Sequence, residues 1–91
     1  MKITVTYFAR PGRREEFLHR VVTAGILSAI REEDGCLRYD YYLSCQNEEE
    51  ILLLEEWESE AHQRLHIEQE HMKRLMDIKN DCISETRVQK D

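Results

Sequence analysis

Apolar residues in this 91-residue chain follow a period of two in some segments and a helical period in others. The first alternating segment, residues 3–9, predicts a strand that ends at the Pro11-Gly12 turn. From Arg13 onward the apolar residues recur every three or four positions, which predicts an amphipathic helix. They are Phe17, Leu18, Val21, Val22, Ile26, Leu27 and Ile30. Gly25 lies inside this predicted helix, where close contact or a kink would account for it.

Asp34-Gly35 marks the turn out of this helix, and strands are predicted over 36–45 and 50–58. The polar residues 46–49 join them as a hairpin. Ser59 is a typical N-cap residue, so a second helix is predicted from there to about Asn80, with a break or bend at 68–70. Its expected inward-facing residues are Ala61, Leu65, Met72, Leu75 and Met76, with weaker support at Ile67 and Ile78. Residues 82–89 form the last predicted strand.

The predicted order is strand, helix, strand, strand, helix, strand. This order is typical of the α+β class, specifically the ferredoxin-like split βαβ arrangement. We therefore expect a single domain over residues 1–91, with a four-stranded antiparallel sheet and both helices on one face.

The third predicted strand is apolar on both faces. Ile51 and Leu53 point one way, and Leu52 and Leu54 point the other. Two helices can cover only one face of the sheet, so the other face would expose an apolar patch unless a partner covers it. We expect a homodimer that packs sheet to sheet, because a second copy is the simplest cover.

The charge and composition of the chain argue against some classes of binding partner. The chain has 13 Lys and Arg against 19 Asp and Glu, a net charge of −6, which argues against nucleic acid and anionic membranes. The longest apolar run is four residues, 51–54, where a membrane span needs about 20. No apolar signal segment follows Met1, so we expect a cytoplasmic protein. The three cysteines form no CxxC pair and are expected to be reduced thiols.

Three histidines, His62, His66 and His71, fall within ten residues of the second predicted helix. His62 and His66 share a helix face that Glu70 continues, so a metal site of these three residues is one hypothesis. No HExxH motif is present and no further ligand can be placed, so no metal is expected. The alternatives are a polar edge of the helix, or a pocket in which one or more histidines transfer protons.

Aromatic residues near these histidines have two interpretations. Trp57, at the end of the third predicted strand, is either a core anchor or one wall of a flat aromatic pocket. Tyr39 and Tyr41 are expected on one strand face with Leu37 and Leu43, as core or interface residues or as hydrogen-bond donors in a pocket. Glu55 and the other acidic residues around Trp57 are expected only to favour the following helix N-terminus.

Three stretches of the sequence resemble the antibiotic biosynthesis monooxygenase domain family. Residues 33–41, EDGCLRYDY, resemble the family's "EEGCxxY" turn and strand. Residues 51–73, from Ile51 through Trp57-Glu58-Ser59 to His71-Met72-Lys73, resemble its "ExWES-xAH-xxxH-xxxxHM" stretch. Arg10-Pro11-Gly12 is similar to its "RPG" turn, and the likeness is closest to the quinol monooxygenase branch.

The resemblance implies a dimeric α+β barrel and a monooxygenase that oxidises a quinol or related electron-rich aromatic with O2 and no cofactor. It implies His66 as the base or anion stabiliser, Trp57 as the pocket wall, and His62 and His71 as helpers. The implied substrate pocket contains Tyr39, Tyr41, Leu53 and Met72. Leu53 stands where the anthrone-oxidising branch has Asn, and Met76 stands where the haem-degrading branch has its iron-ligand His.

Two other functions remain open on the same fold. One is an isomerase that moves a proton on a small carbonyl compound. The other is a non-enzymatic dimer that binds a small ligand. Fold membership alone does not choose among them, because one architecture hosts several chemistries.

Overall fold

The computed structural model describes all 91 residues and has the predicted order of elements, with each predicted helix divided in two. In chain order the elements are β1 (Lys2–Ala9), α1 (Arg14–Thr23), α2 (Ile26–Arg31), β2 (Cys36–Leu43), β3 (Glu50–Trp57), α3 (Glu60–Ile67), α4 (Glu70–Cys82) and β4 (Ile83–Lys90). None of the helices, of which α4 is the longest at 13 residues, is long and apolar enough to cross a membrane.

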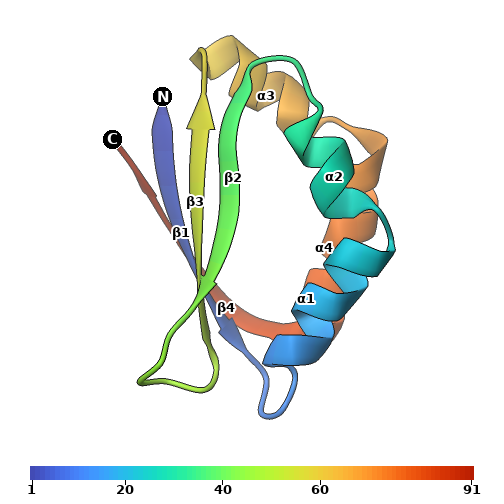
Figure 1. Ribbon diagram of the computed structural model, residues 1–91, viewed down its shortest axis with the longest axis vertical. Coiled ribbons are helices and arrows are strands. Elements are labelled where there is room, and N and C mark those ends of the chain that lie inside the picture. Colours follow the sequence, from blue (N-terminus) through green and yellow to red (C-terminus); the bar gives the residue numbers. More distant parts are fainter.

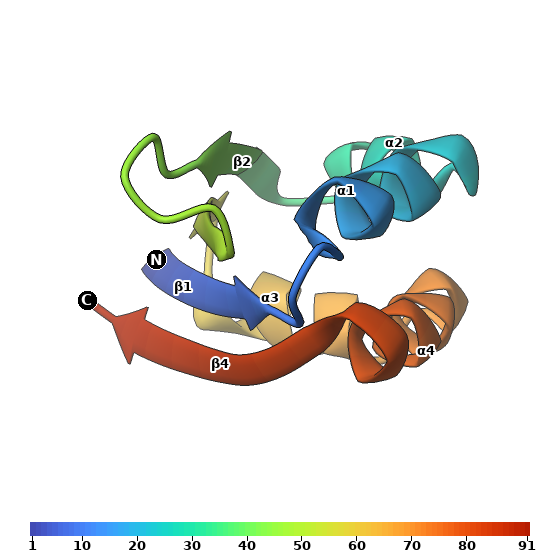
Figure 2. The same ribbon diagram turned by 90° about the horizontal axis from the view of Figure 1, so that it is seen from below.

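The four strands form one antiparallel sheet in the order β2-β3-β1-β4, which confirms the ferredoxin-like prediction. All helices lie on one side of this sheet (Figure 1). Seen from below, α1 and α2 lie toward the β2 edge and α4 lies toward the β4 edge (Figure 2). The two chain ends meet at the same end of the sheet, where the Asp91 N–H donates to the Lys2 carbonyl at 3.1 Å.

The core lies between the sheet and the helices and follows the predicted periods. On β1 and β3 every second residue is buried, and on β3 these residues are Ile51, Leu53, Glu55 and Trp57. From the helices the buried apolar residues are Phe17, Val21, Ile26, Ile30, Leu75, Ile78 and Cys82. The strands thus hold one side of a continuous core, into which a carboxylate, Glu55, also points.

Gly25 separates α1 from α2, so the prediction of one continuous helix is wrong at this point. Its φ is +75°, a left-handed conformation that favours glycine, and it is the N-cap residue of α2. A Cβ at this position would meet no atom within 4 Å, so backbone conformation rather than close contact accounts for the glycine. The kink allows α2 to continue over the sheet in a new direction, while Val22 in the last turn of α1 stays exposed.

The inward face predicted for the second helix is wrong over α3. Leu65 is 57% exposed and Ala61 is also exposed, whereas Gln63 and His66 are buried. The predicted N-cap is confirmed, because the Ser59 hydroxyl accepts from the His62 N–H. The predicted break is confirmed as well, because α3 ends at Ile67 and α4 begins at Glu70. On α4 the expected inward residue Met76 is exposed, whereas Leu75 and Ile78 are buried as predicted.

The hairpin strands are shorter than predicted and their register is irregular at one end. β2 ends at Leu43, two residues before the predicted end, and β3 ends at Trp57. The register between β2 and β3 shifts between Cys36 and Arg38. Leu37 lies at this irregularity and is exposed, so it does not share the buried face of Tyr39.

No helix covers the second face of the sheet (Figure 1). Leu52 and Leu54 of β3 and Phe8 of β1 are on this face and are half-buried within the single chain. Tyr42 of β2, which pairs with Leu52 of β3, is exposed. Apolar side chains lie on this face as the sequence predicts, among polar ones such as Thr4 and Thr6. The sheet-to-sheet homodimer stays a prediction.

Candidate functional site

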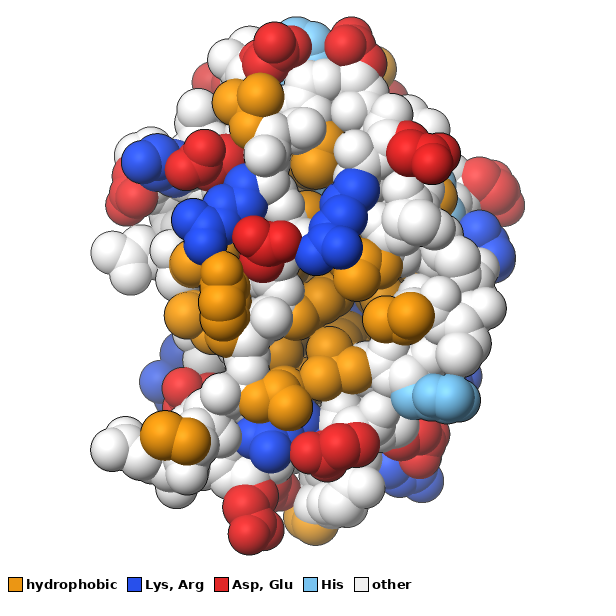
Figure 3. Space-filling model, viewed as in Figure 1, with side chains coloured by type: hydrophobic (Ala, Val, Ile, Leu, Met, Phe, Trp, Pro, Cys, Tyr) orange, Lys and Arg blue, Asp and Glu red, His pale blue; other side chains and the backbone are white.

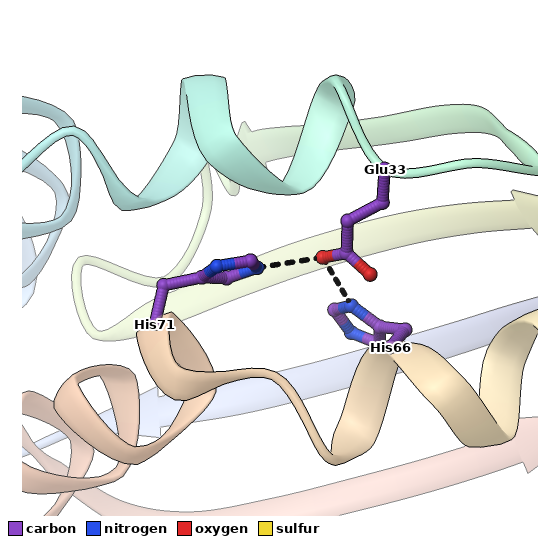
Figure 4. Close-up of side chains that lie close together, drawn as sticks. All are labelled: Glu33, His66 and His71. Atoms are coloured by element: carbon purple, nitrogen blue, oxygen red, sulfur yellow. Dashed lines mark hydrogen bonds and ion pairs between the residues drawn. The ribbon is translucent and has the colours of Figure 1, made fainter.

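Three side chains from separate elements meet at one carboxylate oxygen between the sheet and the helices (Figure 4). Oε2 of Glu33 lies 2.9 Å from Nδ1 of His66 and 2.7 Å from Nε2 of His71. The side chains are 11%, 3% and 14% exposed for Glu33, His66 and His71 respectively. Because the acceptor is a carboxylate oxygen, these are charge-assisted hydrogen bonds. Their low exposure weakens the screening by water.

The helix break between α3 and α4 brings the two histidines to the same carboxylate. His66 is in the last turn of α3 and His71 is in the first turn of α4. In one continuous helix, residues five positions apart would point about 140° away from each other. Glu33 reaches them from the turn after α2, where its N–H donates to the Ile30 carbonyl and its carbonyl accepts from Cys36. No local sequence pattern marks Glu33 as a site residue, because its partners lie more than thirty residues away.

The hydrogen bonds assign the ring protons. An ionised carboxylate has no proton to donate, so Nδ1 of His66 and Nε2 of His71 carry the protons in these two bonds. In the neutral ring of His66 the other nitrogen, Nε2, then holds a lone pair. A carboxylate that fixes the tautomer of an imidazole in this way prepares it to accept a proton.

Trp57 stacks on His66. The two ring centroids are 4.5 Å apart with an interplanar angle of 33°, and Trp57 is fully buried at the end of β3. The Trp57 Nε1–H donates to Oε1 of Glu55 at 3.0 Å. Burial raises the pKa of the Glu55 carboxyl, and the Trp57 hydrogen bond opposes that rise. Trp57 is therefore both a core anchor and the wall beside His66, so its two interpretations do not exclude each other.

The expectation that Glu55 only favours the N-terminus of the following helix is wrong, because its side chain is 8% exposed and points into the core. The alternation of β3 carried the missing signal, since Glu55 lies two residues from both Leu53 and Trp57. Lys79 of α4 is also near this carboxylate, and burial lowers the pKa of its ammonium group against the influence of Glu55. A carboxyl group and an amine whose charged forms burial disfavours thus lie at the edge of the apolar core.

The two tyrosines continue the aromatic cluster from His66 along β2. The ring of Tyr39 is 5.7 Å from that of His66, and the ring of Tyr41 is 5.8 Å from that of Tyr39. Burial raises the pKa of both phenols, so both keep their protons near neutral pH. The Tyr41 hydroxyl is buried and makes no hydrogen bond of standard geometry, although an interaction with Tyr39 partly offsets the rise of its pKa. It is an unused donor in the sheltered space between β2 and the helices.

Of the remaining predicted site residues, Leu53 and Met72 belong to or contact the core, whereas His62 and Glu70 lie away from the cluster. Leu53 is fully buried on β3, and Met72 is half-buried and contacts the core. His62 lies apart from the other two histidines, with Nδ1 2.6 Å from Oγ of Ser59 and Nε2 3.3 Å from Oδ2 of Asp34. Glu70 is exposed and binds Lys73. The hypothetical metal site of His62, His66 and Glu70 is therefore not formed.

The surface next to this cluster is partly apolar. Figure 3 shows hydrophobic side chains in a depression between β2 and the helices α1 and α2. Leu27 of α2 and Tyr41 of β2, from the elements that border it, are partly buried against the core. A separate polar depression of about 690 Å³ lies between the loops that contain Gly12 and Asn47, and is lined by no hydrophobic side chain. Tyr41 of β2 belongs to the aromatic cluster, so the cluster lies on the side of the apolar surface rather than at the polar depression.

Comparison with known proteins identifies the fold family. The family model described as "antibiotic biosynthesis monooxygenase" matches residues 1–77. A search of the curated proteins found no match.

Solved structures agree with this assignment. A protein from Pseudomonas aeruginosa is 25% identical, with a TM-score of 0.83 over 97% of this chain and 87% of its own. A conserved protein from Methanosarcina mazei Go1 is 26% identical, with a TM-score of 0.82 over 97% of this chain and 86% of its own. A third, described as an antibiotic biosynthesis monooxygenase, shares the fold at 24% identity and a TM-score of 0.82, over 97% of this chain and 92% of its own. With the family model matching most of its length, this chain belongs to the antibiotic biosynthesis monooxygenase family.

Proposed function

We propose that this protein is a monooxygenase that oxidises a quinol or a related electron-rich aromatic with O2, with no cofactor taking part in the reaction. The observation that carries the proposal is the pair formed by His66 and Glu33, with Trp57 stacked on the imidazole. Family membership supports the reaction class. The base, its orienting carboxylate and an aromatic wall are the groups that such a reaction requires of a protein.

The substrate supplies the electrons in this reaction. His66 Nε2 accepts a proton from a substrate hydroxyl, and the resulting anion transfers an electron to O2 far more readily than the neutral quinol does. A C–H bond of the ring becomes C–OH while the quinol becomes a quinone, so the substrate loses four electrons. One atom of O2 enters the product and the other leaves as water, which balances the reaction without an external reductant.

The other side chains of the cluster bind and orient in this proposal. Trp57 and Tyr39 offer aromatic surfaces beside His66, and the unpartnered hydroxyl of Tyr41 donates to a substrate oxygen. Leu53 and Met72 contribute apolar surface. His71 keeps Glu33 in place through its 2.7 Å hydrogen bond, so His71 is a positioning residue. His62 lies outside the cluster and is given no role in the reaction.

We further propose that the active form is a homodimer that packs through the open face of the sheet. Leu52, Leu54 and Phe8 supply the apolar surface of that face. A charge introduced there, as in Leu54→Lys, should convert the dimer to a monomer in sedimentation measurements. An unchanged sedimentation coefficient would place the dimer contact, if any, on another surface.

The test of the activity is oxygen consumption with a panel of reduced naphthoquinols, benzoquinols and anthrones, each corrected for its own autoxidation. His66→Ala should lower the rate by about 10²-fold or more, because it removes the base. His19→Ala is the matched control, since His19 is exposed on α1 and should leave the rate unchanged. Absence of uptake above autoxidation with every substrate would refute the proposal, and an unchanged rate in His66→Ala would remove His66 from the mechanism.

A further inference from the structure

We infer that Glu33, His66 and His71 form a binding site for a divalent first-row transition-metal ion. Two imidazoles and one carboxylate converge from three separate segments, and their ligand atoms all lie within 4.8 Å of one another. This ligand set suits zinc and iron(II), since imidazole and carboxylate together select such ions over Mg²⁺ and Ca²⁺.

The distances among the ligand atoms fit one shared ion. In the tetrahedral geometry that zinc prefers, two metal–ligand bonds of about 2.1 Å place their ligand atoms about 3.4 Å apart. Oε2 of Glu33 is 2.9 Å from Nδ1 of His66 and 2.7 Å from Nε2 of His71. An opening of about 0.5–0.7 Å between the carboxylate oxygen and each ring nitrogen, by rotations of the side chains, therefore admits the ion. Figure 4 shows both rings directed at the same carboxylate from α3 and α4.

The surroundings hold the ligands in position before an ion arrives. His66 is fixed between Trp57 and Tyr39, whose ring centroids are 4.5 and 5.7 Å from its own. Low exposure of all three side chains limits the entropy that binding must remove. Each imidazole needs only to move its proton to its other nitrogen, so binding requires no net loss of a proton from a neutral ring.

Metal binding has a consequence that rests on the proposed function. When Nδ1 of His66 binds a metal, the ring proton sits on Nε2, which then cannot accept a proton from substrate. The ion would thus inhibit a reaction in which His66 is the base. Binding itself is independent of that reaction, so it can be tested whether or not the protein consumes O2.

A second group of ligand-type side chains provides an internal control. Asp34, Glu58 and His62 also lie close together, but Asp34 is 94% exposed and only one imidazole is present. Exposed carboxylates are flexible and well hydrated, so this group is expected to bind transition metals weakly. His62→Ala removes its single imidazole and leaves the proposed site intact.

The experiment is titration of the metal-free protein with Zn²⁺ by calorimetry and with Co²⁺ by visible absorption. We expect one ion per chain, with a Co²⁺ spectrum of nitrogen and oxygen ligands rather than the strong near-ultraviolet bands of thiolate. His71→Ala and Glu33→Gln should each weaken the affinity by at least about tenfold. His62→Ala should leave it unchanged.

Two results would overturn the inference. One is the absence of stoichiometric binding to the wild-type protein, and the other is an affinity that falls in His62→Ala but not in His71→Ala. If a variant fails to fold, by circular dichroism, paramagnetic shifts of the wild-type imidazole resonances on adding Co²⁺ decide the question. Shifts of His66 and His71 support the site, and shifts confined to His62 or to cysteine resonances refute it. Inhibition of O2 uptake by Zn²⁺ is a separate readout that tests only the consequence for activity.

Discussion

Nδ1 of His66 donates to Oε2 of Glu33 at 2.9 Å, although 33 residues separate them along the chain. The same oxygen accepts from His71 at 2.7 Å. Glu33 is thus the point at which the turn after α2 meets α3 and α4. If His66 is the base, Glu33 determines which of its nitrogens is free and stabilises the imidazolium that forms.

Glu33→Gln should lower kcat for quinol oxidation by about 10²-fold with little change in KM. The amide has nearly the size of the carboxylate, but it carries no charge to stabilise a protonated His66. Steady-state O2 uptake measures both constants. Glu32→Gln is the matched control, because Glu32 is the neighbouring exposed carboxylate. A change confined to KM would show that Glu33 acts in binding rather than in the proton transfer.

Glu55→Gln should stabilise the protein at neutral pH by on the order of 1 kcal/mol, because it removes a charge that burial disfavours. The amide oxygen can still accept from Trp57 Nε1. Burial raises the folded-state pKa of Glu55 above the ordinary value of 4.5, so the folded state holds this proton more tightly than the unfolded state. The contribution is therefore fully present below about pH 4.5 and is lost as pH rises through the folded-state pKa.

Urea unfolding of wild type and Glu55→Gln from pH 4 to 8 measures this difference, which should widen with pH. Glu56→Gln is the control, because Glu56 is the next residue on β3, is on the other side of the strand, and pairs with Lys2 near the surface. A constant difference across the pH range would mean that Glu55 does not titrate abnormally in the folded protein.

Substitution by Ala should lower the free energy of unfolding by different amounts at Gly25 and at Gly35. Both have left-handed backbone conformations, with φ of +75° and +81°. Gly25→Ala adds a Cβ in open space, so it should cost about 1–2 kcal/mol for the conformation alone. Gly35→Ala should cost clearly more, because its Cβ would overlap the ring of His62. Thermal unfolding of the two variants compares them, and equal losses would argue against tight contact between Gly35 and His62.

The period-two pattern predicted the strands well, because the alternation of side chains along a strand depends only on residues adjacent in the sequence. It placed Ile51 and Leu53 on one face of β3, and the same rule extended to Glu55 and Trp57 would have placed that carboxylate in the core beside them. The helix pattern was less reliable on α3. Leu65 is exposed there because the short helix turns His66 and Gln63 toward the sheet, where Glu33 and the aromatic rings provide partners for polar groups.

The candidate site was only partly predictable for a similar reason. His66, His71 and Trp57 were singled out from their residue types and positions, the resemblance then implied their roles, and the structure brings these three together. His62 shares α3 with His66, but its ring contacts Ser59 and Asp34 instead, and the helix break at residues 68–69 separates Glu70 from both histidines. The place of Glu33 depends on how far the turn after α2 reaches over α3, which is a tertiary property that no local pattern encodes.

Tyr41→Phe separates stability from substrate binding. The Tyr41 hydroxyl is buried without a hydrogen-bond partner, an arrangement that costs about 1–3 kcal/mol relative to a satisfied group. Its removal should therefore leave the free energy of unfolding unchanged or raise it by up to about 1 kcal/mol. If the hydroxyl donates to a substrate oxygen, the same variant should raise KM by roughly tenfold, the equivalent of one hydrogen bond. Urea unfolding and O2 uptake on one preparation measure both effects, and a loss of stability with unchanged KM would make Tyr41 a structural residue only.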